Sequence, residues 1–98
     1  MSYADEIRYA RRQAILLTLH FADGYTLPRV ALRDQVERAG YVMSLDLVAT
    51  EIAWLTEQGY IESLELDTVR LTARGEDIAT GRSQNPGVRR PGPGEVQS

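Results

Sequence analysis

Cysteine is absent from this chain of 98 residues, so the chain can form neither disulfide bridges nor a cysteine-ligated metal site. It also lacks any apolar run near the roughly 20 residues that span a membrane. The first residues, MSYADEIRYARRQ, lack the apolar core of a signal peptide. These absences predict a cytoplasmic protein without membrane contact.

Lysine is absent too, and all 11 basic residues are arginine, set against 14 acids for a net charge of -3. From Met1 to Met43 six arginines face five acids. From Ser44 to Asp67 there are six acids and no base: Asp46, Glu51, Glu57, Glu62, Glu65 and Asp67. The middle of the chain is therefore an acidic block.

Apolar residues make up 43% of the chain, which suits one globular domain near the lower size limit for a core without covalent staples. We expect that domain to cover residues 1–81. The segment 82–98 is dominated by proline, glycine and arginine and offers almost nothing to bury. We expect it to be a disordered tail.

Helical periodicity and capping residues predict three helices in the first sixty residues. The first runs from about Ala4 to Phe21. The second begins at Thr26-Leu27-Pro28, where proline suits a first turn, and Gly40 ends it. Ser44 is a good N-cap for the third, with Asp46 in its first turn, and Gln58-Gly59 is the stop.

After the third helix, the spacing of apolar residues changes from the helical repeat to the two-residue repeat of strands. Residues 60–66 and 69–71 alternate as in a β-hairpin, with a turn expected at Asp67-Thr68. Thr72 caps a last short helix to Thr80. We expect one core from the apolar residues of these elements: Ile15, Leu16, Leu19, Leu32, Val36, Val48, Ile52, Leu55 and Leu71.

Three helices, a hairpin and a short helix, mainly α with a small β-hairpin, are the order of a winged helix, whose second and third helices form a helix-turn-helix. The stretches RQAILLTL, AWLTEQGYI and LTARG, with Ala79 and Gly81 behind them, resemble winged-helix regulators. With its PGVRRP tail, the chain over roughly residues 8 to 93 is also similar to a family of small proteins encoded by Mu-like prophages. The resemblance implies a three-helix core with a wing.

A winged helix that reads DNA places its third helix in the major groove, so the resemblance implies a phage DNA-binding protein acting in gene regulation. With the apolar stripe turned inward, the third helix would offer acids and small residues to the groove, Glu51 among them. The attraction for phosphate would have to come from arginines on the second helix and the wing. The candidate DNA-contacting residues are Arg29, Arg33, Ser44, Asp46, Leu47, Thr50 and Arg70.

Because acidic side chains repel phosphate, a second function is also possible from the sequence. The chain would then be a protein-interaction adaptor that presents the acidic face of the third helix to a basic partner. A continuous basic stripe joining Arg29, Arg33, Arg70 and the N-terminus would favour DNA. Scattered ion-paired arginines, such as Arg33 and Arg38 bonded to Asp34 and Glu37, would favour the adaptor. Leu47, Tyr41 and Tyr25 are candidates for contact with a second copy in a homodimer, or for ordinary packing.

Catalytic chemistry finds no support in the sequence. The carboxylates of Glu76 and Asp77 are adjacent and point apart on a helix, and no nucleophile or glycine-rich phosphate loop lies near them. His20 is a lone histidine, so we expect no metal site and no cofactor. Trp54 is expected to pack against the hairpin as part of the core.

Overall fold

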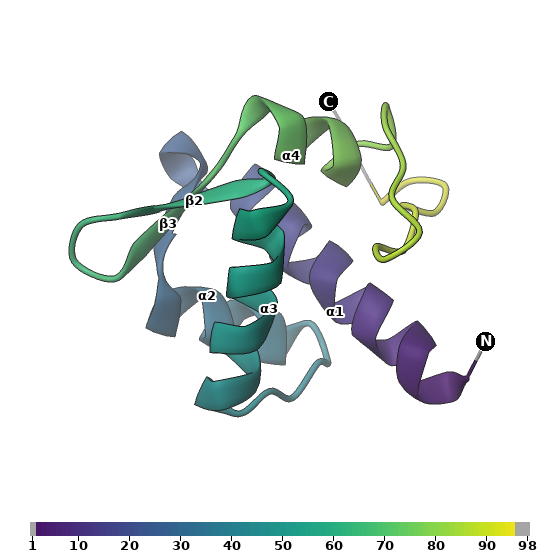
Figure 1. Cartoon of the computed structure of the whole chain (residues 1–98), viewed down its shortest axis with the longest axis horizontal. Coiled ribbons are helices and arrows are strands. Elements are labelled where there is room, and N and C mark those ends of the chain that lie inside the picture. The colour runs from purple at the N-terminus through teal and green to yellow at the C-terminus, as the bar shows by residue number, and fades with distance from the viewer. Residues whose placement is uncertain (1, 96–98) are drawn as a thin grey trace.

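The computed structural model describes residues 2–95 (Figure 1). Its elements, in chain order, are α1 (Tyr3–His20), the 3-10 turn η1 (Asp23–Tyr25), β1 (Thr26–Pro28), α2 (Arg29–Arg38), α3 (Leu45–Glu57), β2 (Ile61–Leu64), β3 (Thr68–Leu71) and α4 (Ala73–Ala79). Together they form a small α+β unit in which α1 contacts α2, α4 and β3.

Side-chain caps explain where the later helices begin. The Ser44 hydroxyl accepts a hydrogen bond from the backbone N–H of Leu47 at 3.1 Å, and the Thr72 hydroxyl accepts one from Gly75 at 3.0 Å. Each bond satisfies an amide that has no partner inside its helix. Both predicted caps are confirmed.

The sheet has three antiparallel strands in the order β1-β3-β2, so it is larger than the predicted hairpin. The additional strand β1 pairs along β3, with Leu27 opposite Val69. Its three residues end in Pro28, which has no N–H to give, and β1 lies at an edge of the sheet where that loss is tolerated. Thr26–Pro28 is therefore a strand that leads into α2, which begins at Arg29, directly after the proline expected in its first turn.

The tip of the hairpin also differs from its prediction. Leu64 pairs with Thr68, which leaves Glu65, Leu66 and Asp67 as the loop instead of a turn at Asp67-Thr68. Leu66 and Asp67 have φ of 59° and 52°, in the left-handed region that glycine or asparagine normally fills. No glycine marked this turn, which is why the sequence pattern misplaced it.

The hydrophobic core agrees with the sequence pattern. All nine predicted core residues are buried, and Met43, Tyr60, Ile61, Val69, Ile78 and Val88 join them. Periodicity selected the inward faces of α1, α2 and α3 correctly because each helix has only one apolar stripe to bury.

The tail differs from the expected disorder over its described part. Residues 82–95 fold back beside α4 and the N-terminal half of α1 (Figure 1). Val88 is 5% exposed, and the backbone N–H of Arg89 donates to the Tyr9 carbonyl at 3.2 Å. The buried Val88 and the hydrogen bonds near it hold a segment whose composition alone predicts disorder. Residues 96–98 of the expected tail lie outside the described part.

Candidate functional site

The outward side of α3 is acidic and built from small residues. Asp46, Ala49, Thr50, Ala53 and Glu57 are exposed, at spacings of three and four that place them on one side of the helix. We call these five residues the α3 face. It contains two carboxylates and no cation.

Apolar side chains border the α3 face where the helix begins. Val42 is 81% exposed and Leu45 is 62% exposed, in the connection from α2 and at the first residue of α3. Ser44 lies between them, with its hydroxyl occupied as the helix cap. The Thr50 hydroxyl donates to the Asp46 carbonyl at 3.0 Å and so is also engaged locally.

Two residues expected on this outward surface lie elsewhere. Leu47 is half-buried and packs against the core. Glu51 is only 2% exposed, and its Oε1 lies 3.1 Å from Nε of Arg12 on α1. Glu51 therefore neutralises the buried Arg12 of α1 instead of facing solvent. Among residues 2–95, no group forms a hydrogen bond with the carboxylate's second oxygen, Oε2.

Two of the three arginines expected to bind phosphate are held by other groups. Arg33 donates from Nε to the Met43 carbonyl at 2.9 Å and lies 3.0 Å from Oε1 of Glu37. Arg70 donates from Nε to Glu62 across the hairpin at 2.7 Å. The carboxylates of Glu37 and Glu62 partly neutralise these two cations, so each has less free charge to offer a phosphate.

Arg29 is the exception in that set. It begins α2 half-buried, and its backbone N–H donates to the Asp67 carbonyl at 2.8 Å, which ties α2 to the hairpin loop. Over residues 2–95 no carboxylate lies within ion-pair distance of its guanidinium.

Arg12 is the centre of a cluster that fixes the tail. Its guanidinium lies 3.9 Å from the centre of the Trp54 ring, and Nη1 donates to the Gly87 carbonyl at 3.1 Å. A Cβ on Gly87 would come within 2.9 Å of Trp54, so only glycine fits. Trp54 packs against the core as expected, and its ring also lies between Arg12 of α1 and Gly87 of the tail, with Tyr60 edge-on at 6.5 Å.

A second polar contact holds the end of the described tail. Gln13, 2% exposed, donates to Oε2 of Glu95 at 2.9 Å and accepts from Nε of Arg89 at 2.8 Å. Burial works against ionisation of Glu95, but the hydrogen bond from Gln13 and the charge of Arg89 outweigh it. The pKa of Glu95 consequently lies below its ordinary value of 4.5.

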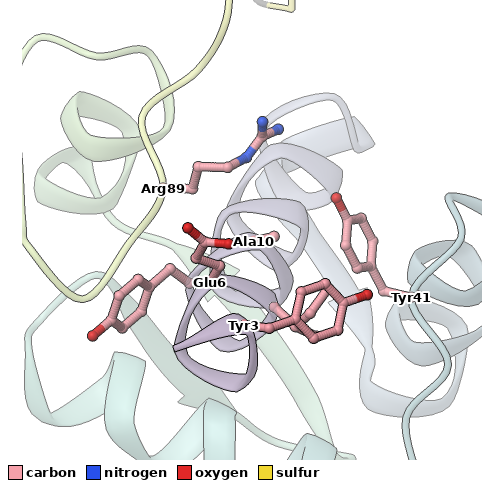
Figure 2. A pocket seen from close by; sticks show the side chains of 7 residues that line it. Tyr3, Glu6, Ala10, Tyr41 and Arg89 are labelled. Atoms are coloured by element: carbon pink, nitrogen blue, oxygen red, sulfur yellow. The ribbon is translucent and has the colours of Figure 1, made fainter. Parts of the chain in front are cut away.

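A pocket of about 400 Å³ opens beside the N-terminal half of α1. Figure 2 shows Tyr3, Glu6 and Ala10 on α1, Tyr41 on the opposite side and Arg89 of the tail around it. Ile7 and Tyr9 complete the lining. The surface offered is mainly apolar and aromatic, with one acid and one arginine.

The sequence pattern could not find these long-range sites. Arg12 and Glu51 are 39 positions apart, and Arg12 and Gly87 are 75 apart, so no local spacing links them. An acid at position 51, between inward-facing positions of an amphipathic helix, is the one signal that a buried partner was needed.

Within residues 2–95 no cluster of three histidine or acidic side chains is arranged to hold a metal ion. His20 lies against the rings of Phe21 and Tyr25. None of the helices in the described part is long and apolar enough to cross a bilayer.

Comparison with known proteins assigns the chain to a family of phage proteins. No family model and no solved structure matches it. It is 40% identical over 65 residues to a protein of Escherichia phage Mu that bears the name uncharacterized protein gp26; the match covers 63% of this chain and 68% of the phage protein. At that identity and coverage, the chain belongs to the same family as gp26 of phage Mu.

Proposed function

We propose that the chain is a winged-helix domain of a phage protein. The order α1, β1, α2, α3, β2, β3 supports this, with α2 and α3 as the helix-turn-helix and the β2-β3 hairpin as the wing. The short strand β1, which the sequence did not indicate, closes the sheet beside the hairpin. The host cytoplasm is the proposed compartment.

We further propose that the domain is a non-enzymatic adaptor whose α3 face binds a basic segment of a protein partner. The observation that carries this proposal is the charge arrangement at the helix-turn-helix. The α3 face has two exposed carboxylates and no cation, while Arg33 and Arg70 are already bonded to Glu37 and Glu62. Nonspecific DNA affinity requires cations that neutralise phosphates, and this surface lacks them.

The small side chains at the centre of the face suit a helical partner. Ala49 and Ala53 allow another backbone to approach closely, and Asp46 and Glu57 lie toward the two ends of α3. Val42 and Leu45 add exposed apolar contact beside it. The matching partner is an amphipathic helix with arginine or lysine beside an apolar stripe.

DNA binding is the second candidate. It is favoured by the exposed N-terminal half of α3, where Ser44, Asp46 and Thr50 lie, and by the unpaired guanidinium of Arg29. Gene regulation through DNA binding would then require Arg29 to contact phosphate. It would also require Arg33 and Arg70 to exchange their carboxylate partners for phosphates.

The adaptor proposal is tested with a defined probe, an amphipathic helical peptide with arginines beside a leucine stripe. We expect its titration into the ¹⁵N-labelled chain to shift amide signals at Asp46, Ala49 and Ala53. Asp46→Asn should weaken binding, and a peptide with glutamate in place of arginine should not bind. Shifts confined to other surfaces would refute the assignment of the α3 face.

A further inference from the structure

The described tail consists of a short link and a segment that is anchored on the domain. Helix α4 ends at Ala79, and the exposed residues 82–84, here called the link, follow closely. The backbone N–H of Ser83 donates to the Asp77 carbonyl at 3.0 Å. Residues 85–89, here called the anchor, come directly after the link, where the chain has already turned back beside α1 (Figure 1).

The anchor is held by a few specific contacts. The Asn85 side chain donates to the Tyr60 hydroxyl at 2.8 Å, and Arg12 donates to the Gly87 carbonyl at 3.1 Å. Val88 is the one apolar side chain that the anchor buries. The domain residues that receive the anchor, here called the tail groove, are Tyr9, Arg12, Trp54 and Tyr60.

Docking of the anchor rests on one buried valine and a few hydrogen bonds, so its local stability is low compared with that of the helices. Such a segment opens and recloses while the rest of the domain stays folded. An open copy presents a free anchor and an empty tail groove, and a second open copy presents the same two surfaces. Every contact that holds the anchor in its own groove is therefore available, unchanged, in the groove of another copy.

The length of the link decides between docking within one copy and docking on another. Within one copy, the chain must reverse its direction between the end of α4 and Asn85, which is bonded to Tyr60. Gly81 makes part of this reversal with φ of 83°, a conformation that glycine adopts without strain. Between copies the link extends and the reversal is not needed. Short connections of this kind favour exchange of the connected segment between copies.

We infer that two copies of this chain exchange their tails, so that the anchor of each docks in the tail groove of the other. The partner is a second copy because the groove already holds this anchor sequence in the single chain. Each copy gives one anchor and receives one, so the assembly closes at two copies. This inference uses residues outside the α3 face and does not depend on the adaptor proposal.

The exchange should depend on protein concentration, because each tail also competes for its own groove. A short tether gives that competition an effective concentration in the millimolar range, and a strained tether lowers it. We therefore expect dimers of the full chain to form between about 0.1 and 1 mM in sedimentation equilibrium. When ¹³C-labelled and unlabelled copies are mixed, an isotope-filtered spectrum should show nuclear Overhauser contacts between Gly87 of one copy and the Trp54 ring of the other.

Two variants of the full chain separate tail exchange from any other self-association. A flexible insert of four glycine and serine residues after Ser83 leaves anchor and groove intact but lets each tail reach its own groove without strain, so dimerisation should weaken about tenfold or more. Gly87→Ala should abolish the dimer, because its anchor fits neither groove. The groove of that variant is then empty, and an added peptide of residues 82–95 should shift its Trp54 indole signal.

The same peptide carrying Gly87→Ala is the matched control and should leave the Trp54 signal unchanged. Circular dichroism melts check that both chain variants keep the fold. The inference is overturned by a chain that stays monomeric to about 1 mM, by a dimer that the insert leaves unchanged or strengthens, or by a Gly87→Ala chain that does not bind the native peptide.

Discussion

The buried pair of Arg12 and Glu51 shows how the placement of one residue changes the charge of a surface. As an exposed acid, Glu51 would repel phosphate; as a buried one, at 3.1 Å from Arg12, it balances a cation that would otherwise be isolated in the core. The acidic character of α3 therefore rests on Asp46 and Glu57.

Glu51→Gln should destabilise the fold. Glutamine keeps the shape of the side chain but leaves the Arg12 charge without a counterion, so we expect a loss of about 1 to 3 kcal/mol in unfolding free energy measured by urea denaturation. Glu57→Gln, on the exposed side of the same helix, is the control and should change stability by less than about 0.5 kcal/mol. Equal stability of the two variants would mean that the pair contributes nothing.

Gly87 is the residue on which docking of the tail depends most. Gly87→Ala puts a Cβ within 2.9 Å of the Trp54 ring and 3.1 Å of Nη1 of Arg12, so we expect the tail to detach. Hydrogen exchange at Val88 and Arg89 should become faster, and the Trp54 fluorescence maximum should move to longer wavelength. Ser83→Ala adds no contact at this point, and faster exchange there too would contradict the explanation.

Among the elements, those that depend on local patterns were predicted and those that depend on distant partners were not. The helices, the hairpin and the caps at Ser44 and Thr72 follow from periodicity and capping chemistry. Strand β1 exists because β3 offers a free edge, and the tail is ordered because Trp54 and Arg12 meet Gly87. The candidate site followed the same division. The exposure of Asp46 and Thr50 was predicted, and a local ion pair of Arg33 with Asp34 or Glu37 was one of two alternatives, whereas the pairing of Arg70 with Glu62 across the hairpin was not predicted.

The packing of α3 against α1 and the sheet gives a direct stability prediction. Leu55 is fully buried, so Leu55→Ala leaves a cavity that the surrounding side chains fill only in part. We expect a loss of about 2 to 5 kcal/mol in chemical denaturation. Ala53→Gly, on the exposed side of α3, supplies the comparison at about 1 kcal/mol through helix propensity alone. A similar loss in both would show that α3 is not the packed element described.

Docking of the tail should depend on pH through Glu95. Its pKa is lower folded than unfolded, so its contribution is present above the unfolded pKa and is lost as the pH falls through the folded one. Amide signals of Val88 and Arg89, followed by NMR from about pH 6 to about pH 3, should report weaker docking at the acid end. Glu95→Gln should remove this step, and an unchanged profile would contradict the contact.

At the scale of the whole molecule, charge and architecture point to different partners. The helix-turn-helix proposed above is one that DNA-binding proteins use, but one fold can serve several functions. In this chain the α3 face is acidic, and Arg33 and Arg70 are bonded to Glu37 and Glu62, whereas Arg29 has no ion-pair partner within residues 2–95. The exposed carboxylates of Asp46 and Glu57 therefore favour the proposed basic protein partner.

The most direct test of that conclusion is fluorescence anisotropy of a labelled DNA duplex of mixed sequence, titrated with the full chain at about 20 mM salt, where phosphate contacts are strongest. If the chain is a protein-binding adaptor, the anisotropy of the duplex should show no salt-sensitive binding of the chain to DNA. Binding that weakens steeply with salt, and whose salt slope falls by about one in Arg29→Ala, would contradict it and establish DNA as the partner.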